Sequence, residues 1–328
     1  MVPLFTFIPE FVPRFNCYVQ TSSTARFGSI QDLCMPTGTR PRPPEIDRQR
    51  LSVVGMVSQE DDFDILKVVF RAVPGLPNYV VAMKSLHASA DPVYRSFLMQ
   101  EAALLVDLDH PHVVKLIGVV TLADPIGLVL EYCEYGLLEQ YILRNDLSLS
   151  EEYRIAGDVA DGMAYLHTQH IVHRSLAAGN IMVDSTKRCK ISLTGHSRCM
   201  FGDSAAVCQG DAVPVHWCAP ECLTKQLFSE QSDVWAFGVV LYEVFTRGGI
   251  PFEDMLGKQV REVLISGTKP PMPHGCPAEL ATILRMCWSE YGARASFVAL
   301  AKHIRVVEAS SSIEKEQGDI RQMRIDEV

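Results

Sequence analysis

Apolar and polar positions change their pattern twice along the chain. Residues 1–44 show no periodicity, and Ser, Thr, Pro and Gly dominate from Thr21 to Pro44, a composition that predicts an irregular segment. From residue 51 onward, short strand-like apolar runs follow one another. These runs are Leu51–Val57, Ile65–Arg71, Tyr79–Lys84, Val113–Val120 and Gly127–Tyr132.

One predicted helix interrupts the strands. Asp91 is suited to the N-cap position and Pro92 to the first helical position, because proline lacks an N–H that would need a partner there. Leu98, Leu105 and Leu108 give this helix an apolar stripe.

After Gly136 the pattern becomes helical. Ser148 and Glu151 form a capping-box pattern at the start of the next helix. That helix has one apolar face, made of Ile155, Val159, Met163 and Leu166. Further helices are predicted over Ser232–Thr246 and Ala278–Val307.

This order predicts an α+β chain with a small β-rich lobe followed by a larger helical lobe. We expect an irregular segment over 1–44 and one domain over 45–306, with its lobes at about 45–134 and 135–306. Residues 307–328 form a polar tail that we expect to fray.

Composition narrows the function. The chain has 328 residues, of which 48% are hydrophobic and 21% charged, as in a soluble globular protein. Its net charge of −9 argues against nucleic acid as a partner. The ten cysteines show no zinc-ligand spacing, so we expect reduced thiols, no metal site and a cytoplasmic protein. Prolines break the apolar start, and no run is long enough for a transmembrane segment.

Six segments, in the right order, resemble motifs of protein kinases. They are VVAMK at 80–84, FLMQEA at 97–102, VHRSLAAGNIMV at 172–183, CAPE at 218–221, SDVWAFGVVLYEVFTRG at 232–248 and MCWSEYGARASF at 286–297. One such match is a weak signal, but chance does not explain all six. The resemblance implies the bilobal protein kinase fold.

Within that family the chain resembles tyrosine kinases, through LAAGN at 176–180 and PVHWCAPE at 214–221. It is most similar to the focal adhesion kinase family, on the stretches LDHPHVVKLIGVVT, SRCMFGDS and GTKPPMPHGCPAEL. This narrower resemblance implies protein partners. It also implies a cytoplasmic location at the membrane periphery, in adhesion or receptor complexes.

The kinase resemblance also implies roles for single residues. Lys84 would contact nucleotide phosphates, and Glu101 would pair with Lys84. Leu130, Glu131 and Cys133 stand at further nucleotide-contacting positions.

Other positions that match the family have structural roles. Asp233 would hold the backbone of the catalytic loop, and His173 would bond the backbone near residue 193. Glu221 and Arg294 would form a buried ion pair.

At two positions the chain departs from the kinase pattern and lacks a residue that phosphate transfer needs. Ser175 stands where a kinase has the Asp that accepts the proton of the substrate hydroxyl, and a serine hydroxyl is a very poor base. Leu193 stands where a kinase has the Asp that holds magnesium, and leucine offers no oxygen ligand. Asn180 matches the family, but one amide cannot replace a carboxylate as a ligand of magnesium. The alternative is a structural role, in which Asn180 forms a local hydrogen bond that braces the loop.

The glycine-rich loop, expected around residues 59–66, is also altered. Gln59, Asp61 and Asp64 align with its glycines, and Phe63 aligns with its aromatic residue. Side chains would hinder the approach of backbone N–H groups to phosphates. Four residues of this stretch are acidic, and each carboxylate about 4 Å from a phosphate charge costs roughly 4 kcal/mol at an effective dielectric of about 20. The plainer interpretation is a solvated acidic loop.

Further departures affect substrate and regulation. Gly179 replaces the loop arginine of tyrosine kinases, and Ala205 and Ala206 replace the paired tyrosines of focal adhesion kinases. No tyrosine occurs between residues 193 and 221, so switching by tyrosine phosphorylation there is excluded. Arg174 therefore has no phosphotyrosine to bind.

Three hypotheses remain open. The first is a pseudokinase that acts as a non-catalytic scaffold or allosteric partner of other proteins. The second is an atypical ATP-dependent protein tyrosine kinase that retains residual activity through Lys84, Glu101 and Asn180. The third is a remnant without a dedicated partner. We expect no cofactor, and at most weak ATP binding without a complete magnesium site.

Overall fold

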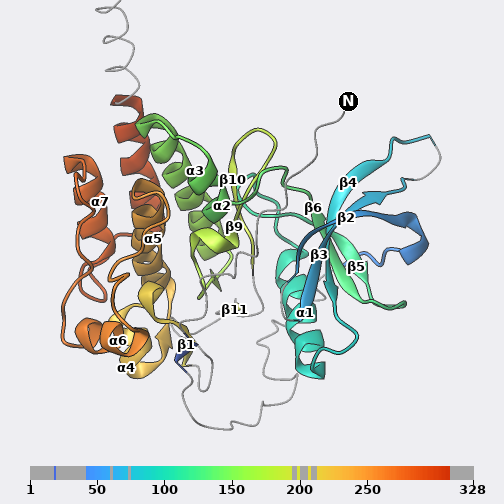
Figure 1. The fold of residues 1–328 in the computed structure, drawn as a ribbon, viewed down its shortest axis with the longest axis horizontal. Coiled ribbons are helices and arrows are strands. Elements are labelled where there is room, and N and C mark those ends of the chain that lie inside the picture. Colours follow the sequence, from blue (N-terminus) through green and yellow to red (C-terminus); the bar gives the residue numbers. More distant parts are fainter. Residues whose placement is uncertain are drawn as a thin grey trace, which may run out of the picture.

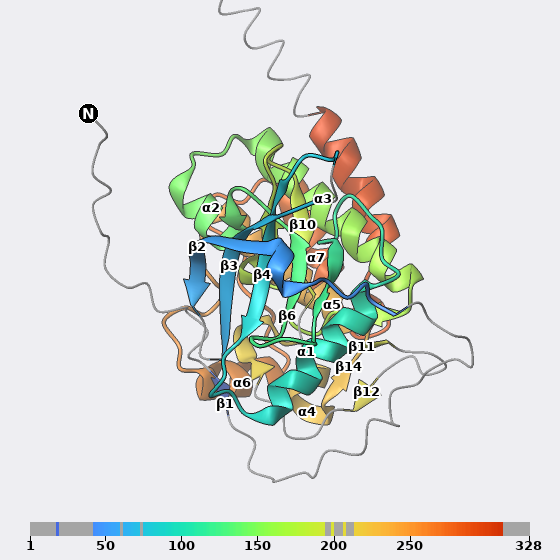
Figure 2. The same ribbon diagram turned by 90° about the vertical axis from the view of Figure 1, so that its right-hand side faces the viewer.

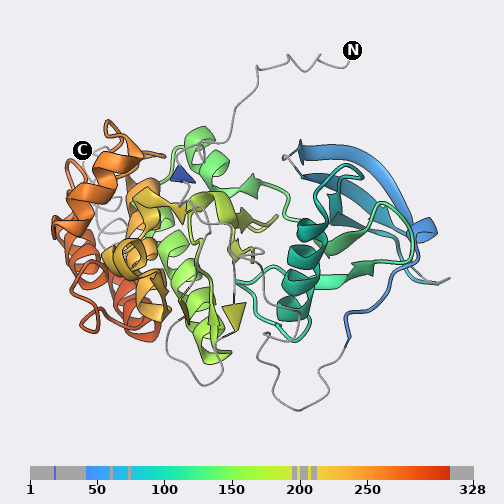
Figure 3. The same cartoon turned by 90° about the horizontal axis from the view of Figure 1, so that it is seen from below.

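The computed structural model describes residues 18–19, 42–59, 62–72, 75–193, 198–199, 206–207 and 213–310. Within these residues a five-stranded antiparallel sheet comes first and a mainly helical region follows. The two lie side by side, with the sheet at one end of the molecule and the helices at the other (Figures 1 and 3). This arrangement confirms the predicted α+β, bilobal kinase-like fold.

The sheet of the N-terminal lobe has the strand order β2-β3-β4-β6-β5. Its strands are β2 (Leu51–Gln59), β3 (Phe63–Phe70), β4 (Tyr79–Leu86), β5 (Leu116–Val120) and β6 (Gly127–Glu131). The β-branched and aliphatic side chains on one face of β3 and β4 form a separate small core, in which Val68, Val81 and Met83 are fully buried. On the opposite face the register places Ile65 beside Lys84.

One helix, α1 (Pro92–Leu105), packs beside this sheet (Figure 2). Its start follows the predicted capping, because the Asp91 carboxylate accepts the Val93 N–H at 2.9 Å. Leu98 and Leu105 are buried, as predicted, and so is Glu101 on the same face. The apolar stripe therefore orients the helix so that Glu101 points toward the sheet.

The helical lobe is built around a helix that is apolar on nearly all sides. This is α5 (Glu230–Phe245), in which 12 of 16 residues are buried, as expected for the central helix of a lobe. Around it lie α2 (Leu138–Arg144), α3 (Leu149–Thr168), α4 (Pro220–Lys225), α6 (Gly257–Ile265), α7 (Ala278–Cys287) and a helix over 297–310. The predicted capping box of α3 is present, because the Ser148 amide donates to the Glu151 carboxylate at 2.9 Å.

Short strands and 3-10 turns connect these helices. The strand pairs are β7 (Gly136–Leu137) with β9 (Ile181–Val183), β9 with β10 (Cys189–Ile191), β8 (Ile171–Val172) with β11 (Arg198–Cys199), β12 (Ala206–Val207) with β14 (Leu227–Phe228), and β1 (Tyr18–Val19) with β13 (Val213–Pro214). The 3-10 turns cover Arg48–Arg50, Ala178–Asn180 and Val215–Trp217. The turn at Ala178–Asn180 ends the loop after β8 and contacts α5.

Two predicted elements differ from those observed. The strand predicted from Val113 begins only at Leu116, because Val113 instead forms an isolated bridge to Ile191. The helical stretch predicted over 278–307 consists of two helices, since α7 ends at Cys287 and the next begins at residue 297. The turn between them contains Gly292 with φ of 86°, a backbone conformation that glycine adopts most readily.

The two lobes are joined behind the predicted catalytic loop. The Ile191 amide donates to the His112 carbonyl, and the Val114 amide to the Ile191 carbonyl, both at 2.9 Å. Gly162 of α3 permits this contact, because an added Cβ would lie 2.5 Å from the His112 carbonyl oxygen. No helix in the described ranges is both long enough and apolar enough to cross a bilayer.

Candidate functional site

Lys84 and Glu101 form the ion pair that the sequence predicted between strand and helix. Lys84 Nζ lies 2.9 Å from Glu101 Oε2, with side-chain exposures of 17% and 2%. Lys84 comes from β4 and Glu101 from α1, so the pair fixes the helix against the sheet. Removing either partner of a pair this buried would leave an uncompensated charge, so the pair couples α1 to β4.

Phe63 lies against the same lysine. Its ring centroid is 4.8 Å from Lys84 Nζ, and its ring meets that of Tyr94 on α1 edge-on, with centroids 5.9 Å apart. Phe63 is only 9% exposed and belongs to the main hydrophobic core. An aromatic ring therefore occupies one side of the ammonium group, a placement that the sequence did not predict.

The positions that replace the loop glycines are only partly described. Gln59 is the last residue of β2, and Asp64 is the second residue of β3. Asp61 lies outside the described residues. One carboxylate oxygen of Asp64 lies 2.9 Å from His87 Nε2. The electrostatic barrier expected from the acidic loop stays a prediction.

Two of the three further expected nucleotide positions, Leu130 and Glu131, end β6, and Cys133 follows the strand. Leu130 and Cys133 are 8% and 4% exposed, and burial raises the pKa of the Cys133 thiol to about 12. The Glu131 carboxylate accepts the Lys115 amide at 2.7 Å and lies 3.0 Å from Lys190 Nζ on β10. It therefore ties the end of the sheet to the helical lobe.

Asp233 of α5 holds the catalytic loop by its backbone. One carboxylate oxygen accepts the His173 amide at 2.8 Å, and the other accepts the Arg174 amide at 2.9 Å. Arg174 has φ of 69°, which is uncommon for a residue with a Cβ. In place of a phosphate, its guanidinium stacks on the Phe228 ring at 4.6 Å.

Ser175 and Asn180 bond each other. The Asn180 side-chain amide donates to the Ser175 carbonyl at 2.7 Å and to its hydroxyl at 3.3 Å. The Ser175 amide lies 3.3 Å from His173 Nδ1. The amide nitrogen of Asn180 thus braces the loop.

Leu193, at the magnesium position, is an apolar core residue. It is 1% exposed and packs within the main hydrophobic cluster. Just before it, the Ser192 carbonyl oxygen lies 3.0 Å from His173 Nε2, so the expected link from His173 to this segment exists. Burial lowers the pKa of His173, which favours a neutral imidazole donating to that carbonyl.

The donor set at this position does not suit magnesium. A hard dication needs oxygen ligands, and residue 193 supplies only a buried alkyl side chain. In the part of the chain that the structure describes, no group of three His, Cys, Asp or Glu is placed to hold a metal ion.

Glu243 joins the catalytic loop to the segment after β13, and the sequence did not identify it. Its Oε2 accepts the Ala178 amide and the Trp217 indole N–H, each at 3.0 Å. Glu243 is 5% exposed. The available signal was a single carboxylate within the otherwise apolar stretch after Asp233.

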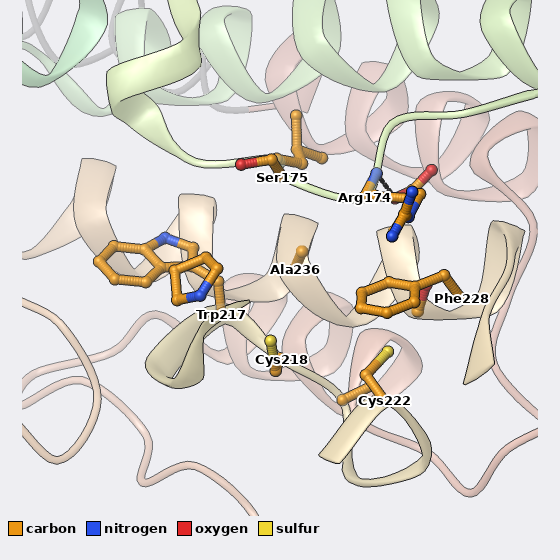
Figure 4. A pocket seen from close by; sticks show the side chains of 12 residues that line it. Arg174, Ser175, Trp217, Cys218, Cys222, Phe228 and Ala236 are labelled. Atoms are coloured by element: carbon orange, nitrogen blue, oxygen red, sulfur yellow. Dashed lines mark hydrogen bonds between the residues drawn. The ribbon is translucent and has the colours of Figure 1, made fainter. Parts of the chain in front are cut away.

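A small pocket lies beside this connection, with room for roughly one water molecule. Ser175 lies on one wall, and Trp217 and Cys218 lie across from it (Figure 4). Burial raises the pKa of Cys218 to about 12, so its thiol is protonated at neutral pH. The pocket lining also includes Arg174 and Asp233, so charged side chains border it beside Ser175.

The second predicted ion pair is also present. Arg294 donates to both carboxylate oxygens of Glu221, at 2.5 and 3.0 Å, and the two side chains are 2% and 8% exposed. The guanidinium also stacks on Trp235 at 4.9 Å. The pair links α4 to the turn before the last helix.

A five-stranded sheet, a clamped helix and a loop held by Asp233 together define a protein kinase domain. The family described as "Protein tyrosine and serine/threonine kinase" matches residues 65–304, and the chain belongs to this family.

Among curated proteins, the chain is similar to ephrin type-A receptor 7 of Gallus gallus (37% identity, 68% of this chain and 23% of the receptor). It is similar to ephrin type-A receptor 8 of Homo sapiens (34%, covering 74% and 25%) and to the human tyrosine-protein kinase FRK (36%, covering 64% and 42%). The chain thus spans about a quarter of the length of these receptors. The resemblance to tyrosine kinases is confirmed, and the narrower one to focal adhesion kinases stays a prediction.

Proposed function

We propose that this chain is a pseudokinase of the tyrosine kinase family that binds other proteins as a scaffold or allosteric partner. The observation that carries the proposal is Leu193, a fully apolar side chain buried in the core at the position of the magnesium ligand. Without a metal, the charge on transferring phosphate lacks its main stabilisation. Ser175 adds to this, because its hydroxyl is no useful base at neutral pH.

Phe63 supports the same function. A phosphate approaching Lys84 needs space and a free direction of approach to the ammonium group. The Phe63 ring lies on one side of that group and Glu101 on another. Nucleotide binding would therefore have to move a buried aromatic ring, which costs the packing it makes with Tyr94.

One observation favours the alternative, an atypical ATP-dependent protein tyrosine kinase. The Lys84–Glu101 pair is intact at 2.9 Å, and active kinases require that pair. Asn180 also stands beside Ser175. We rank the atypical kinase function second, because the Lys84–Glu101 ion pair supplies neither a general base nor a metal ligand.

The expected partners are proteins, and no membrane or nucleic-acid partner is proposed. The focal adhesion kinase resemblance supports a cytoplasmic place near adhesion or receptor complexes. The ephrin receptors among the relatives are themselves receptors by name, which agrees with this setting.

The decisive experiment is a thermal-shift titration with ATP, with and without magnesium or manganese. A ligand at 100 times its Kd should stabilise by about 2.7 kcal/mol, a shift of a few degrees for a domain of this size. We expect no shift at millimolar ATP. Phosphotransfer to a tyrosine polymer is measured in parallel, and we expect none above that of Lys84→Ala.

Lys115→Ala is the matched control, because Lys115 also lies 2.9 Å from a carboxylate, that of Asp109, but at the surface. Suppose that ATP with metal raises the melting temperature of the wild-type chain and of Lys115→Ala, but not of Lys84→Ala. That result would refute the expectation that the chain does not bind ATP. Phosphotransfer to tyrosine that is present in the wild-type chain and in Lys115→Ala, but absent in Lys84→Ala, would establish the alternative function.

A further inference from the structure

Strand β2 is an edge strand of the sheet and carries exposed apolar side chains. It stands first in the strand order, next to β3 (Figure 2). Four of its nine residues, Val53, Val54, Met56 and Val57, are 49%, 61%, 58% and 45% exposed. No other strand or helix in the described ranges exposes four large apolar side chains within five positions. An exposed apolar edge of this kind is a typical site of association.

Two bulges decide how β2 can be covered. Its pairing with β3 shifts once after Val53 and again after Met56. Val54 and Val57 are therefore extra residues without a partner on β3. Bulges in an edge strand interrupt the row of main-chain groups that another strand would need. A partner would therefore contact the side chains of β2 and would not extend the sheet along its whole length.

The exposed side chains border the smaller of the two hydrophobic cores. Val53 lies opposite Val68, which is fully buried, and Met56 lies opposite Leu66. Directly opposite residues share a face of the sheet, so Val53 and Met56 lie on the face that carries this core. The core has only eight buried residues. A partner that covers β2 would therefore extend a small core.

Gly55 lies at the middle of the exposed patch. A Cβ added there would meet no atom within 4 Å, so crowding inside the lobe does not require glycine at this position. Glycine within a strand often stands at a bulge or where another backbone approaches closely. The absence of a side chain at Gly55 leaves room for a second backbone at the centre of the patch.

The charges at the two ends of β2 have opposite signs. Arg48 and Arg50 precede the strand and Asp62 follows it. The Arg48 guanidinium donates to the Leu51 carbonyl at 3.2 Å. The Arg50 guanidinium donates to the Arg71 carbonyl at 2.9 Å. These hydrogen bonds are to neutral groups, so they leave the positive charge at the start of β2 in place.

A patch with this order of charges is complementary to itself. In a two-fold dimer, the same patch of each copy is buried against that of the other. If the two β2 strands run antiparallel about Gly55, Arg48 of one copy faces Asp62 of the second copy, because each lies seven residues from Gly55. The apolar stretch 53–57 of one copy then meets the same stretch of the second.

We propose that β2 is a self-association surface whose occupant is a second copy of this chain, with the two β2 strands antiparallel about Gly55. A single strand is a small contact, since stable interfaces bury about 800 Å² on each partner. The dimer should therefore be weak, with a Kd of about 10–100 μM. The proposal goes beyond the pseudokinase function, because it depends on neither nucleotide nor phosphate transfer.

The first test is sedimentation equilibrium of the full chain from about 2 to about 200 μM, a range that brackets the expected Kd. The apparent mass should rise toward that of a dimer. Val54→Glu places a charge in the apolar patch at a position that is 61% exposed, and should raise the Kd about tenfold or more. Leu122→Glu is the matched control, with the same change at an 86% exposed position between β5 and β6. It should change the Kd less than about twofold.

Two outcomes of this test would overturn the proposal. One is a wild-type chain that stays monomeric over the whole range, which would leave a segment of the same chain or another protein as the occupant of β2. The other is a Val54→Glu variant that associates as tightly as the wild-type chain. Circular dichroism shows whether each variant is folded.

The second test exchanges the charges at the ends of β2. Arg48→Glu and Asp62→Arg each place like charges opposite each other in a dimer of that variant, so each alone should associate about fivefold more weakly than the wild-type chain. A mixture of the two variants restores both pairs of opposite charge. The mixed dimer should therefore form with a Kd within about twofold of the wild-type value.

Fluorescence anisotropy of one labelled variant, titrated with the other, measures the mixed dimer. A mixture that associates no more tightly than either variant alone would overturn the proposal. Neither test involves nucleotide, so failure here is distinct from failure of the pseudokinase proposal.

Discussion

The strongest prediction about stability concerns the buried carboxylate of Asp233. It is 1% exposed and accepts the amides of His173 and Arg174 at 2.8 and 2.9 Å. His167 Nε2 lies 3.2 Å from it as well. Arg174 is kept at a positive φ that costs roughly 1–2 kcal/mol in a non-glycine residue. Asp233 thus holds a strained loop in place.

Asp233→Asn tests this without changing the shape of the side chain. An amide offers one acceptor oxygen, so its NH2 group must face one of the two backbone N–H donors. A hydrogen bond to a charged group contributes about 1.5–3 kcal/mol, and a buried unsatisfied donor costs a further 1–3 kcal/mol or so. Part of this is offset, because a neutral amide is cheaper to bury than a carboxylate. We expect a net loss of about 2–4 kcal/mol.

The assay is urea unfolding followed by tryptophan fluorescence, with the slope of free energy against urea compared between variants. Asp161→Asn is the control, because Asp161 pairs at 2.6 Å with the largely exposed Arg305 and should cost less than about 1 kcal/mol. A loss for Asp233→Asn no greater than for Asp161→Asn would refute the reasoning.

Two further predictions concern buried charges. Arg294→Met leaves the Glu221 carboxylate buried and unpaired, so we expect a loss of about 3–5 kcal/mol by urea unfolding; adding Glu221→Gln should recover part of it, and no recovery would contradict the pairing. Burial raises the pKa of Glu152 to about 7 despite Arg247 at 3.4 Å. The folded state therefore keeps a proton that the unfolded chain releases, so this group's contribution to stability is fully present below about pH 4.5 and is lost as pH rises through about 7. Between pH 4.5 and 7, the free energy of unfolding of the wild-type chain should fall by about 1–2 kcal/mol more than that of Glu152→Gln, after allowance for solvent. An equal fall in both proteins would contradict the raised pKa of Glu152.

Local signals predicted most of the fold. The cap at Asp91 and the capping box at Ser148 depend on neighbouring residues only, so the sequence contains all that determines them. The first residue of a strand was harder to predict where the backbone pairs instead with a residue distant in the sequence. Val113 has a strand-like side chain, but its backbone pairs with Ile191 across the lobes, which no local pattern can indicate.

The site divides in the same way. The Lys84–Glu101 and Glu221–Arg294 pairs follow from residue types at family positions. The inward position of Phe63 could not be predicted, because it depends on the packing of Tyr94 from another element. The expected electrostatic barrier from Asp64 stays a prediction, and the structure adds only that His87 Nε2 lies 2.9 Å from one of its carboxylate oxygens.

The presence of Lys84 in a site that we propose to lack a metal ligand has a structural explanation. Its ammonium has Glu101 at 2.9 Å and the Phe63 ring at 4.8 Å, both supplied by the chain itself. Removing Lys84 would leave the Glu101 carboxylate, 2% exposed, without this partner, which is strongly destabilising for a buried pair. A role in placing α1 is therefore enough to account for both residues. Their presence says that the helix is held against the sheet, and nucleotide binding has to be established on separate grounds.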